Sequence, residues 1–314
     1  MLVDMYGRPV RGLRITVTHR CNYRCFYCHM EGEEERGDEL TVNDIAKLVR
    51  IGKGLGIDKV KLTGGEPLSR RDIVDVVKAI SNVGITDLAM TTNGSLLQEL
   101  VERLVEAGLK RINVGLPSLK KEVFEKITGV DMLDKVIGGL LKAKDFDLRP
   151  IKLNTVLLKG LNDGEVWDLV EFAGRYGFIL QVIELEPLGL ADELYDKYHA
   201  PLDAIERWLE DRAVKVEERK DMQNRRQYDL GHVKVELVKA VNNPEFCMHC
   251  TRLRITADGK LKPCLMRNDN LIDVLGALRR GASDEELSRL FVEAVKAREP
   301  YFKDSCRTER ARIC

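Results

Sequence analysis

Short β-branched runs alternate with longer amphipathic stretches from residue 11 to about residue 187. The pattern predicts strands at residues 13–18, 59–64, 87–92, 111–116, 151–158 and 180–186. It predicts helices within residues 42–56, 70–84, 95–109, 131–145 and 163–177. Strands that alternate with helices of this length form βαβ units and a parallel sheet. Six consecutive units favour a barrel or partial barrel over an open sheet.

Polar and apolar residues alternate within several of these strands. The polar set includes Arg14, Lys61, Asn113 and Lys152. If the apolar face packs on the helices, the polar face lines the barrel interior. Ordinary barrels fill that interior with Val, Ile and Leu, so the pattern predicts a wet lumen that holds a polar or anionic group. A sheet with one solvent-facing side is the alternative interpretation.

The pattern changes between residues 190 and 200. A helix is predicted at residues 201–211, short antiparallel strands within residues 213–238, and two helices at about 271–281 and 284–298. We therefore expect two regions, residues 1–195 and residues 196–314, without a disordered linker between them.

Charge and composition narrow the possible partners. Among 314 residues, 51 Lys and Arg balance 51 Asp and Glu. No global basic field would recruit nucleic acid, so an anion site must be local. There is no run of 18 apolar residues and no apolar signal segment after the first charges. These features predict a cytosolic protein, in which the eight cysteines would stay reduced.

Six of the cysteines form two groups of three. The groups are Cys21, Cys25 and Cys28, spaced C-x3-C-x2-C, and Cys247, Cys250 and Cys264, spaced C-x2-C-x13-C. A structural zinc site normally has four ligands. Thiolates are also the usual ligands of four-iron clusters, and three of them leave one iron open. The ligand count therefore favours iron–sulfur clusters, with zinc as the alternative.

The first group carries a specific resemblance. Tyr27 stands directly before its third cysteine, and "LTGGEP" (residues 62–67) ends the second predicted strand. These two motifs together are similar to those of the radical SAM superfamily, in which the open iron binds S-adenosylmethionine. Gly64 and Gly65 have no side chain to block a ligand from the backbone. Taken alone, the GGEP motif could be an ordinary βα turn.

The second group is followed by "CTRLRIT", which places Arg252 and Arg254 on one face of a short strand. Two adjacent guanidiniums suit an anion or a planar polar ring, although solvated surface arginines are the alternative. With all these motifs, the chain resembles nearly end to end the GTP 3',8-cyclase family, which begins molybdenum cofactor (molybdopterin) biosynthesis.

The resemblance implies an α/β fold: a partial (βα)6 TIM-type barrel whose open side is covered by a smaller C-terminal α+β region. It implies a lyase that converts GTP to 3',8-cyclo-7,8-dihydroguanosine 5'-triphosphate, with two 4Fe-4S clusters and S-adenosylmethionine as cofactors. The implied contacts are the two cysteine trios for the clusters, Tyr27, Gly64 and Gly65 for S-adenosylmethionine, and Arg14, Lys61, Thr91, Lys152, Arg252 and Arg254 for GTP. It assigns no catalytic acid or base to a side chain.

The resemblance also implies partners. These are a flavodoxin- or ferredoxin-type electron donor, a downstream pterin-forming enzyme and a second copy of the chain in a homodimer, without nucleic acid or membrane. Three positions depart from the family: Gly115 replaces a serine, Gln181 an arginine and Glu186 a methionine. The Gly-Gly tail of many bacterial members is absent, and Cys306 and Cys314 receive no role.

Two other functions compete with this interpretation. One is a radical SAM enzyme that acts on a peptide through an auxiliary cluster, for which more C-terminal cysteines and no basic lumen are expected. The other is a zinc-stabilised nucleic-acid-binding protein, for which bound zinc and no GGEP motif are expected.

Overall fold

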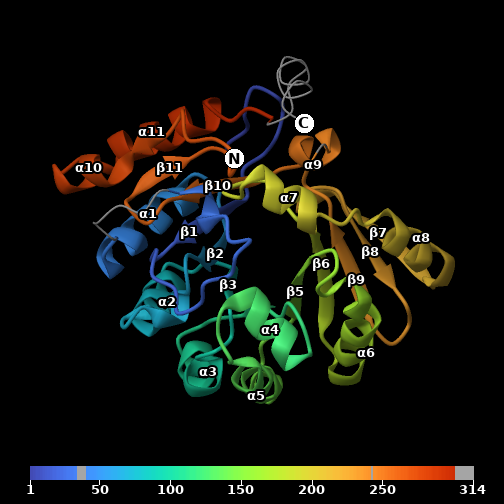
Figure 1. The fold of residues 1–314 in the computed structure, drawn as a ribbon. Coiled ribbons are helices and arrows are strands. Elements are labelled where there is room, and N and C mark those ends of the chain that lie inside the picture. Colours follow the sequence, from blue (N-terminus) through green and yellow to red (C-terminus); the bar gives the residue numbers. More distant parts are fainter. Residues whose placement is uncertain (34–39, 242, 301–314) are drawn as a thin grey trace.

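The computed structural model of the chain describes residues 1–33, 40–241 and 243–300, so Cys306 and Cys314 lie outside the described residues. Six parallel strands form the centre of one curved sheet, and helices cover its outer face (Figure 1). The strands are β1 (Gly12–Thr16), β2 (Lys59–Thr63), β3 (Asp87–Thr92), β4 (Arg111–Gly115), β5 (Ile151–Leu157) and β6 (Ile179–Glu184). The helices are α1 (Val42–Gly54), α2 (Ile73–Asn82), α3 (Leu97–Glu106), α4 (Lys121–Thr128), α5 (Leu133–Lys144) and α6 (Val166–Tyr176).

The six predicted strands and five predicted helices of this half are confirmed. Helix α4 was not predicted, because its eight residues contain only three large apolar positions and give little periodic signal. It ends at Gly129, which adopts a left-handed φ of 75°.

The C-terminal strands extend the same sheet at both edges, in the order β12-β11-β10-β1-β2-β3-β4-β5-β6-β9-β8-β7. They are β7 (Lys215–Arg219), β8 (Arg225–Asp229), β9 (Lys234–Val238), β10 (Arg252–Ile255), β11 (Lys260–Lys262) and β12 (Ile272–Asp273). Strand β8 pairs antiparallel with both β7 and β9, as predicted, but β9 also pairs in parallel with β6. Strand β10 pairs in parallel with β1. The result is a partial barrel that does not close.

The remaining helices flank this sheet. They are α7 (Asp192–Tyr198), α8 (Asp203–Arg212), α9 (Pro244–Met248), α10 (Val274–Arg279) and α11 (Asp284–Lys296). Figure 1 shows α10 and α11 on the side of α1, with α8 beside β7 and β8. Nowhere in the described ranges is a helix both long enough and apolar enough to cross a membrane.

The alternation in β1 explains how the core and the interior are separated. Leu13 and Ile15 are fully buried with Leu48 of α1 in the main hydrophobic core. Arg14 points the other way and lies beside Lys61 in the register of β1 with β2. The interior is therefore polar, as predicted, and the interpretation as a solvent-facing sheet is wrong.

Candidate active site

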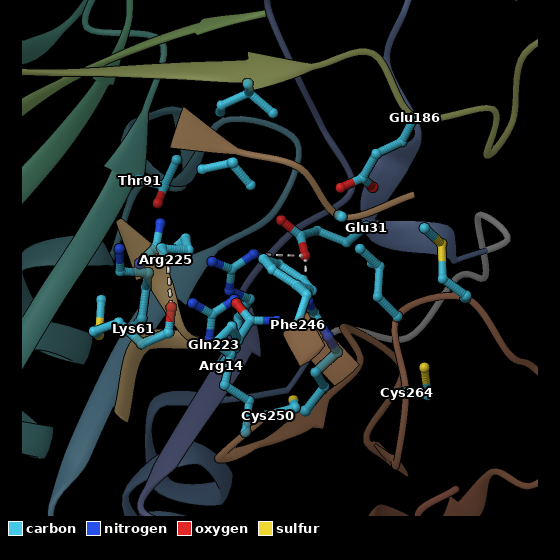
Figure 2. Close-up of a pocket in the computed structure, with 18 of the residues that line it drawn as sticks. Arg14, Glu31, Lys61, Thr91, Glu186, Gln223, Arg225, Phe246, Cys250 and Cys264 are labelled. Atoms are coloured by element: carbon cyan, nitrogen blue, oxygen red, sulfur yellow. Dashed lines mark hydrogen bonds and ion pairs between the residues drawn. The ribbon is translucent and has the colours of Figure 1, made fainter. Parts of the chain in front are cut away.

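A cavity of about 260 Å³ lies on the inner face of the sheet. Its lining carries eight Arg or Lys side chains and three Glu side chains. The cations are Arg8, Arg14, Lys61, Arg111, Lys152, Arg225, Arg252 and Arg254, and the carboxylates are Glu31, Glu186 and Glu299. All six residues that the resemblance assigned to GTP line this cavity, and Figure 2 shows Arg14, Lys61 and Thr91 among them. A chain without net charge thus has a strongly basic local site.

Lys61 and Arg252 stand in this cavity without a carboxylate in salt-bridge contact among the described residues. The Lys61 ammonium donates to Oδ1 of Asn113 at 3.0 Å. Burial lowers the pKa of Lys61 well below its usual value, and the cations Arg14 and Arg111 lower it further. Burial and Arg14 likewise lower the pKa of Arg252. Two buried cations of this kind are best stabilised by an anionic ligand.

Lys152 shares one buried carboxylate with two arginines. Glu236 accepts from Nζ of Lys152 at 2.5 Å, its second oxygen lies 3.6 Å from Nη1 of Arg225, and Arg219 also pairs with it. Burial would raise the pKa of Glu236, but these cations outweigh burial and lower the pKa to about 2. Burial lowers the pKa of Lys152 to about 8, although Glu236 opposes that shift. Three cations on one carboxylate leave two positive charges for a ligand.

Glu31 forms a polar wall of the cavity and was not predicted from the sequence. Met30 and Glu31 adopt positive φ values of 46° and 54°, a backbone conformation that is uncommon for residues other than glycine. The Glu31 carboxylate accepts from Nη1 of Arg254 and from Oγ1 of Thr63, each at 2.7 Å, and lies 3.5 Å from Nη1 of Arg14. Burial would raise its pKa, but Arg14 and Arg254 outweigh burial and lower it.

The first cysteine trio lies in the loop that follows β1, outside the lining of the cavity. Cys21 and Cys28 are exposed and Cys25 is half-buried. The backbone N–H of Cys28 donates to the carbonyl of Cys25 at 3.0 Å, which closes a turn around the C-x2-C pair. The loop is also tied to the end of α4, because the N–H of Arg24 donates to the carbonyl of Thr128 at 2.9 Å.

Gly64 and Gly65 pack directly against this loop. A Cβ atom on Gly65 would lie 2.4 Å from the carbonyl oxygen of Arg20, and one on Gly64 would lie 2.4 Å from that of Thr18. The N–H of Gly65 donates to the Thr18 carbonyl at 2.8 Å, and the N–H of Glu66 to that of Arg20 at the same distance. The two glycines therefore set how closely the GGEP turn approaches the cysteine loop.

Replacing Gly65 with alanine is expected to displace the loop of the first cysteine trio. The added methyl overlaps two backbone carbonyls that cannot move independently, so unfolding should become easier by about 1–3 kcal/mol. The thiols of Cys21 and Cys25 should react faster with a labelling reagent. Thermal unfolding and thiol-labelling rates measure both effects.

Gly164→Ala is the matched control for this substitution. A Cβ atom at Gly164 meets no atom within 4 Å. This variant should keep the unfolding temperature and labelling rates of the parent. Equal behaviour of the two variants would contradict the packing role of Gly65.

Glu66 links the GGEP turn to the end of β3 and, through Asn93, to the first cysteine loop. Its carboxylate accepts from Oγ1 of Thr92 at 2.5 Å and from the N–H of Asn93 at 2.6 Å. The amide of Asn93 donates in turn to Oδ1 of Asn22, between the first two cysteines, at 2.8 Å. Burial raises the pKa of Glu66 to about 7. The GGEP motif was found in the sequence, but only the contacts of Glu66 with residues 92–93, and of Asn93 with Asn22, show that it acts on the cysteine loop.

The second trio lines the cavity directly. Cys247 lies in α9, and Cys264 follows β11. The N–H of Cys250 donates to the carbonyl of Cys247 at 3.1 Å, so the C-x2-C turn repeats that of the first trio. Burial would raise the pKa of Cys250, but Arg298 and Arg252 outweigh burial and lower it. These thiols face the same space as the basic side chains (Figure 2).

The donor sets fit polynuclear clusters better than single metal ions. All six cysteines in the described ranges are free thiols. In the same ranges, no three His, Cys, Asp or Glu side chains gather closely enough to hold one metal ion. A tetrahedral zinc ion with bonds of about 2.3 Å would bring its sulfur ligands to about 3.8 Å from one another. A four-iron cluster binds each thiolate through a different iron, which suits thiols that are further apart.

The three departures from the family pattern lie in different surroundings. Gln181 and Glu186 line the cavity, whereas Gly115 does not. Gln181 pairs in register with Glu236, the carboxylate that holds Lys152. The Oε2 atom of Glu186 is buried without a hydrogen-bond partner in the described part of the chain, and Figure 2 shows its carboxylate in the cavity. Tyr27 does not line the cavity but packs on a small cluster that includes Leu185.

Comparison with known proteins identifies the family. Residues 15–173 match the radical SAM superfamily, and residues 178–304 match the molybdenum cofactor synthesis C-terminal family. A curated relative from Thermococcus kodakarensis, named probable GTP 3',8-cyclase, is 53% identical over 96% of this chain and 100% of its own length. A relative of the same name from Pyrococcus abyssi is 48% identical, over 96% of this chain and 100% of its own length.

A solved structure agrees at the level of the fold. Streptococcus suis SuiB bound to S-adenosylmethionine matches with a TM-score of 0.64 and 18% identity, over 90% of this chain and 68% of that chain. At this identity the likeness establishes the fold alone. The near-complete match to the curated relatives decides the family. The chain therefore belongs to the radical SAM superfamily and, within it, to the GTP 3',8-cyclase family.

Proposed function

We propose that this enzyme cyclises GTP to 3',8-cyclo-7,8-dihydroguanosine 5'-triphosphate, the first step of molybdenum cofactor biosynthesis. The observation that carries the proposal is one cavity that combines Lys61 and Arg252, which have no salt-bridge partner among the described residues, with the three thiols of the second trio. A triphosphate needs several cations, and this cavity offers them where the chain as a whole has no net charge.

The first trio would hold a 4Fe-4S cluster, with Tyr27, Gly64 and Gly65 next to S-adenosylmethionine. When bound, these groups supply the radical chemistry that removes a hydrogen atom from C3' of the GTP ribose. The protein would hold the ribose in place and exclude water and oxygen from the site. Glu66 and Asn93 would keep the cysteine loop in position through their hydrogen bonds.

The triphosphate would be bound by Lys61 and Arg252, which have no carboxylate in salt-bridge contact among the described residues, and by Lys152, which shares Glu236 with two arginines. Arg14 and Arg254 already share Glu31, so they would orient the ligand as well as neutralise it. We assign the second trio to a second 4Fe-4S cluster, whose open iron would face the guanine ring. Its position in the lining of the same cavity supports this assignment.

Several partners follow from this proposal. A flavodoxin- or ferredoxin-type protein would supply electrons, and a pterin-forming enzyme would consume the product. Because GTP and such reductants are cytosolic, the enzyme would work in the cytosol, where thiols also stay reduced. We further propose residues 1–195 as the radical SAM barrel and residues 196–314 as the region that carries the second cluster.

The function is tested by anaerobic turnover. Protein loaded with iron and sulfide is incubated with S-adenosylmethionine, dithionite and GTP. We expect 5'-deoxyadenosine together with a cyclised form of GTP, and no cyclised nucleotide when ATP replaces GTP. If fully loaded protein gives neither product with GTP, the proposal is wrong.

GTP binding is expected to weaken as the pH rises above 8. Lys152, whose pKa is lowered to about 8 by burial, is protonated below that pH and neutral above it. A neutral amine loses its charge-assisted hydrogen bonds to phosphate, which are worth about 1.5–3 kcal/mol. The dissociation constant of GTP should therefore rise about 10–100-fold between about pH 7 and pH 10, as measured by isothermal titration calorimetry.

Lys152→Arg is the control for this pH dependence. A guanidinium stays charged throughout the range, so the part of the dependence that comes from Lys152 should disappear. If the parent and this variant show the same pH profile, Lys152 is not the group that titrates.

A further inference from the structure

A buried ion cluster lies behind the second cysteine trio and joins the two ends of the described chain. Its members are Asp4, Arg8 and Arg298, which are 6%, 5% and 1% exposed. The Asp4 carboxylate lies 2.7 Å from Nε of Arg8 and 3.2 Å from Nη1 of Arg298. Two buried guanidiniums thus share one carboxylate.

Both guanidiniums bind the backbone of the cysteine turn. Nη1 of Arg8 donates to the carbonyl of Cys247 at 2.9 Å, and Nη2 of Arg298 donates to the carbonyl of Cys250. Nη1 of Arg298 also donates to the carbonyl of Arg8 at 3.1 Å. Each end of the C-x2-C turn is therefore held by a separate cation.

A gain in folding stability does not by itself explain why Asp4, Arg8 and Arg298 are buried. A buried ion cluster is often no more stabilising than apolar side chains of the same volume, because desolvation offsets the attraction. This cluster carries one more positive than negative charge. In addition, Nη2 of Arg8 has no hydrogen-bond partner in the described part of the chain, although it is buried and Arg8 lines the cavity.

We propose that Asp4, Arg8 and Arg298 are positioning residues for the second metal centre: they hold the turn of Cys247 and Cys250 and keep positive charge beside its thiolates. This inference rests on the proposed assignment of a second cluster to the second trio. Backbone carbonyls bound by fixed cations keep the turn closed, and the fixed positive charge attracts the negative charge that thiolate ligands bring to a metal centre. In the described part of the chain, no hydrogen bond or ion pair joins the first trio to this cluster of charges, so only the second centre should depend on it.

The alternative is that the three residues only fasten the N-terminal segment to the region after α11. The two roles are separated by counting iron in a chain whose first trio is replaced, Cys21→Ser, Cys25→Ser and Cys28→Ser. All cluster iron in that background belongs to the second trio, and we expect about four irons per chain after anaerobic loading. Adding Arg298→Met should reduce this to less than about one.

Arg70→Met is the matched control in the same background. Arg70 is also 5% exposed, pairs with Asp72 at 2.6 Å and donates to the carbonyl of Val17 at 2.7 Å. Arg70 follows β2 and binds the backbone just after β1, so Arg70→Met should leave about four irons bound. In the reciprocal background, with the second trio replaced by serine, Arg298→Met should leave the iron of the first trio unchanged.

Two further variants address folding and charge. Arg298→Met leaves Asp4 and Arg8 as a neutral buried pair, so the variant should stay folded, as measured by thermal unfolding, while it loses the iron. Arg298→Lys keeps the charge and should recover part of the iron. In Arg8→Gln, the loss of positive charge should shift the reduction potential of the second centre to a more negative value.

The outcomes separate this inference from the proposed function. If the chain without the first trio binds no iron, the second cluster is absent and both proposals fail. If it binds about four irons and still does so with Arg298→Met, only the positioning role is wrong. Loss of iron in Arg70→Met as well as in Arg298→Met would also overturn it, because the effect would then reflect general instability.

Discussion

Replacing Cys264 with serine is expected to abolish formation of the cyclised nucleotide and to leave cleavage of S-adenosylmethionine intact. Cys264 lines the basic cavity with Cys247 and Cys250, and the first trio lies outside that lining. A serine hydroxyl is a poor iron ligand, so the second trio would be reduced to two thiolates. We expect product formation to fall by at least about 1000-fold, equivalent to about 4 kcal/mol in the barrier.

The measurement follows both products in one anaerobic reaction. Cyclised nucleotide should disappear, whereas 5'-deoxyadenosine should still form with dithionite as reductant. Cys306→Ser is the control, since the sequence assigns Cys306 no role. Turnover that survives in Cys264→Ser would show that the second trio is not needed for the chemistry.

Replacing Lys61 with methionine is expected to weaken GTP binding and, at the same time, to stabilise the protein without GTP. The Lys61 ammonium is buried, has no carboxylate in salt-bridge contact among the described residues and donates to the side chain of Asn113. Removing an uncompensated buried charge gains about 3 kcal/mol, whereas the lost hydrogen bond costs about 1 kcal/mol. The free energy of unfolding should therefore rise by about 2 kcal/mol.

Loss of the same charge should raise the dissociation constant of GTP by about 10–100-fold, because a charge-assisted hydrogen bond to phosphate is worth about 1.5–3 kcal/mol. Calorimetric titration with GTP and denaturant unfolding without it measure the two effects. Lys78→Met is the control: Lys78 is an exposed residue of α2 and should change neither quantity. Unaltered GTP affinity in Lys61→Met would show that Lys61 does not bind GTP. A lower free energy of unfolding would show that other groups in the protein already compensate the Lys61 charge.

The basic interior was predictable for the residues that lie in regular strands. Arg14, Lys61 and Lys152 occupy polar positions of strands whose other face is apolar, and a period of two assigns them to the interior. The cysteine trios and the GGEP motif were predictable as well, since their spacing is local. Lys61, Lys152 and the second trio do line one cavity, which agrees with the shared site that the sequence implied.

Other residues of the site could not be predicted from a pattern in the sequence. Glu31 follows the first trio in an irregular segment, and its charge reaches Arg254 because two residues there adopt positive φ values. Glu236 is one polar residue in a short strand, and its contact with Lys152 depends on β9 pairing with β6. Local sequence does not encode which strands pair across a long connection.

The sequence by itself determined the family, the βαβ order, the two cysteine trios and the sign of the charge inside the barrel. These properties depend on residue type and on spacing over a few positions, which a chain carries before it folds. The tertiary structure alone decided that β9 and β10 extend the sheet at its two edges, and that Asp4, Arg8 and Arg298 meet behind Cys247 and Cys250. Those contacts join residues separated by most of the chain, so they exist only once strand pairing and burial have brought them together.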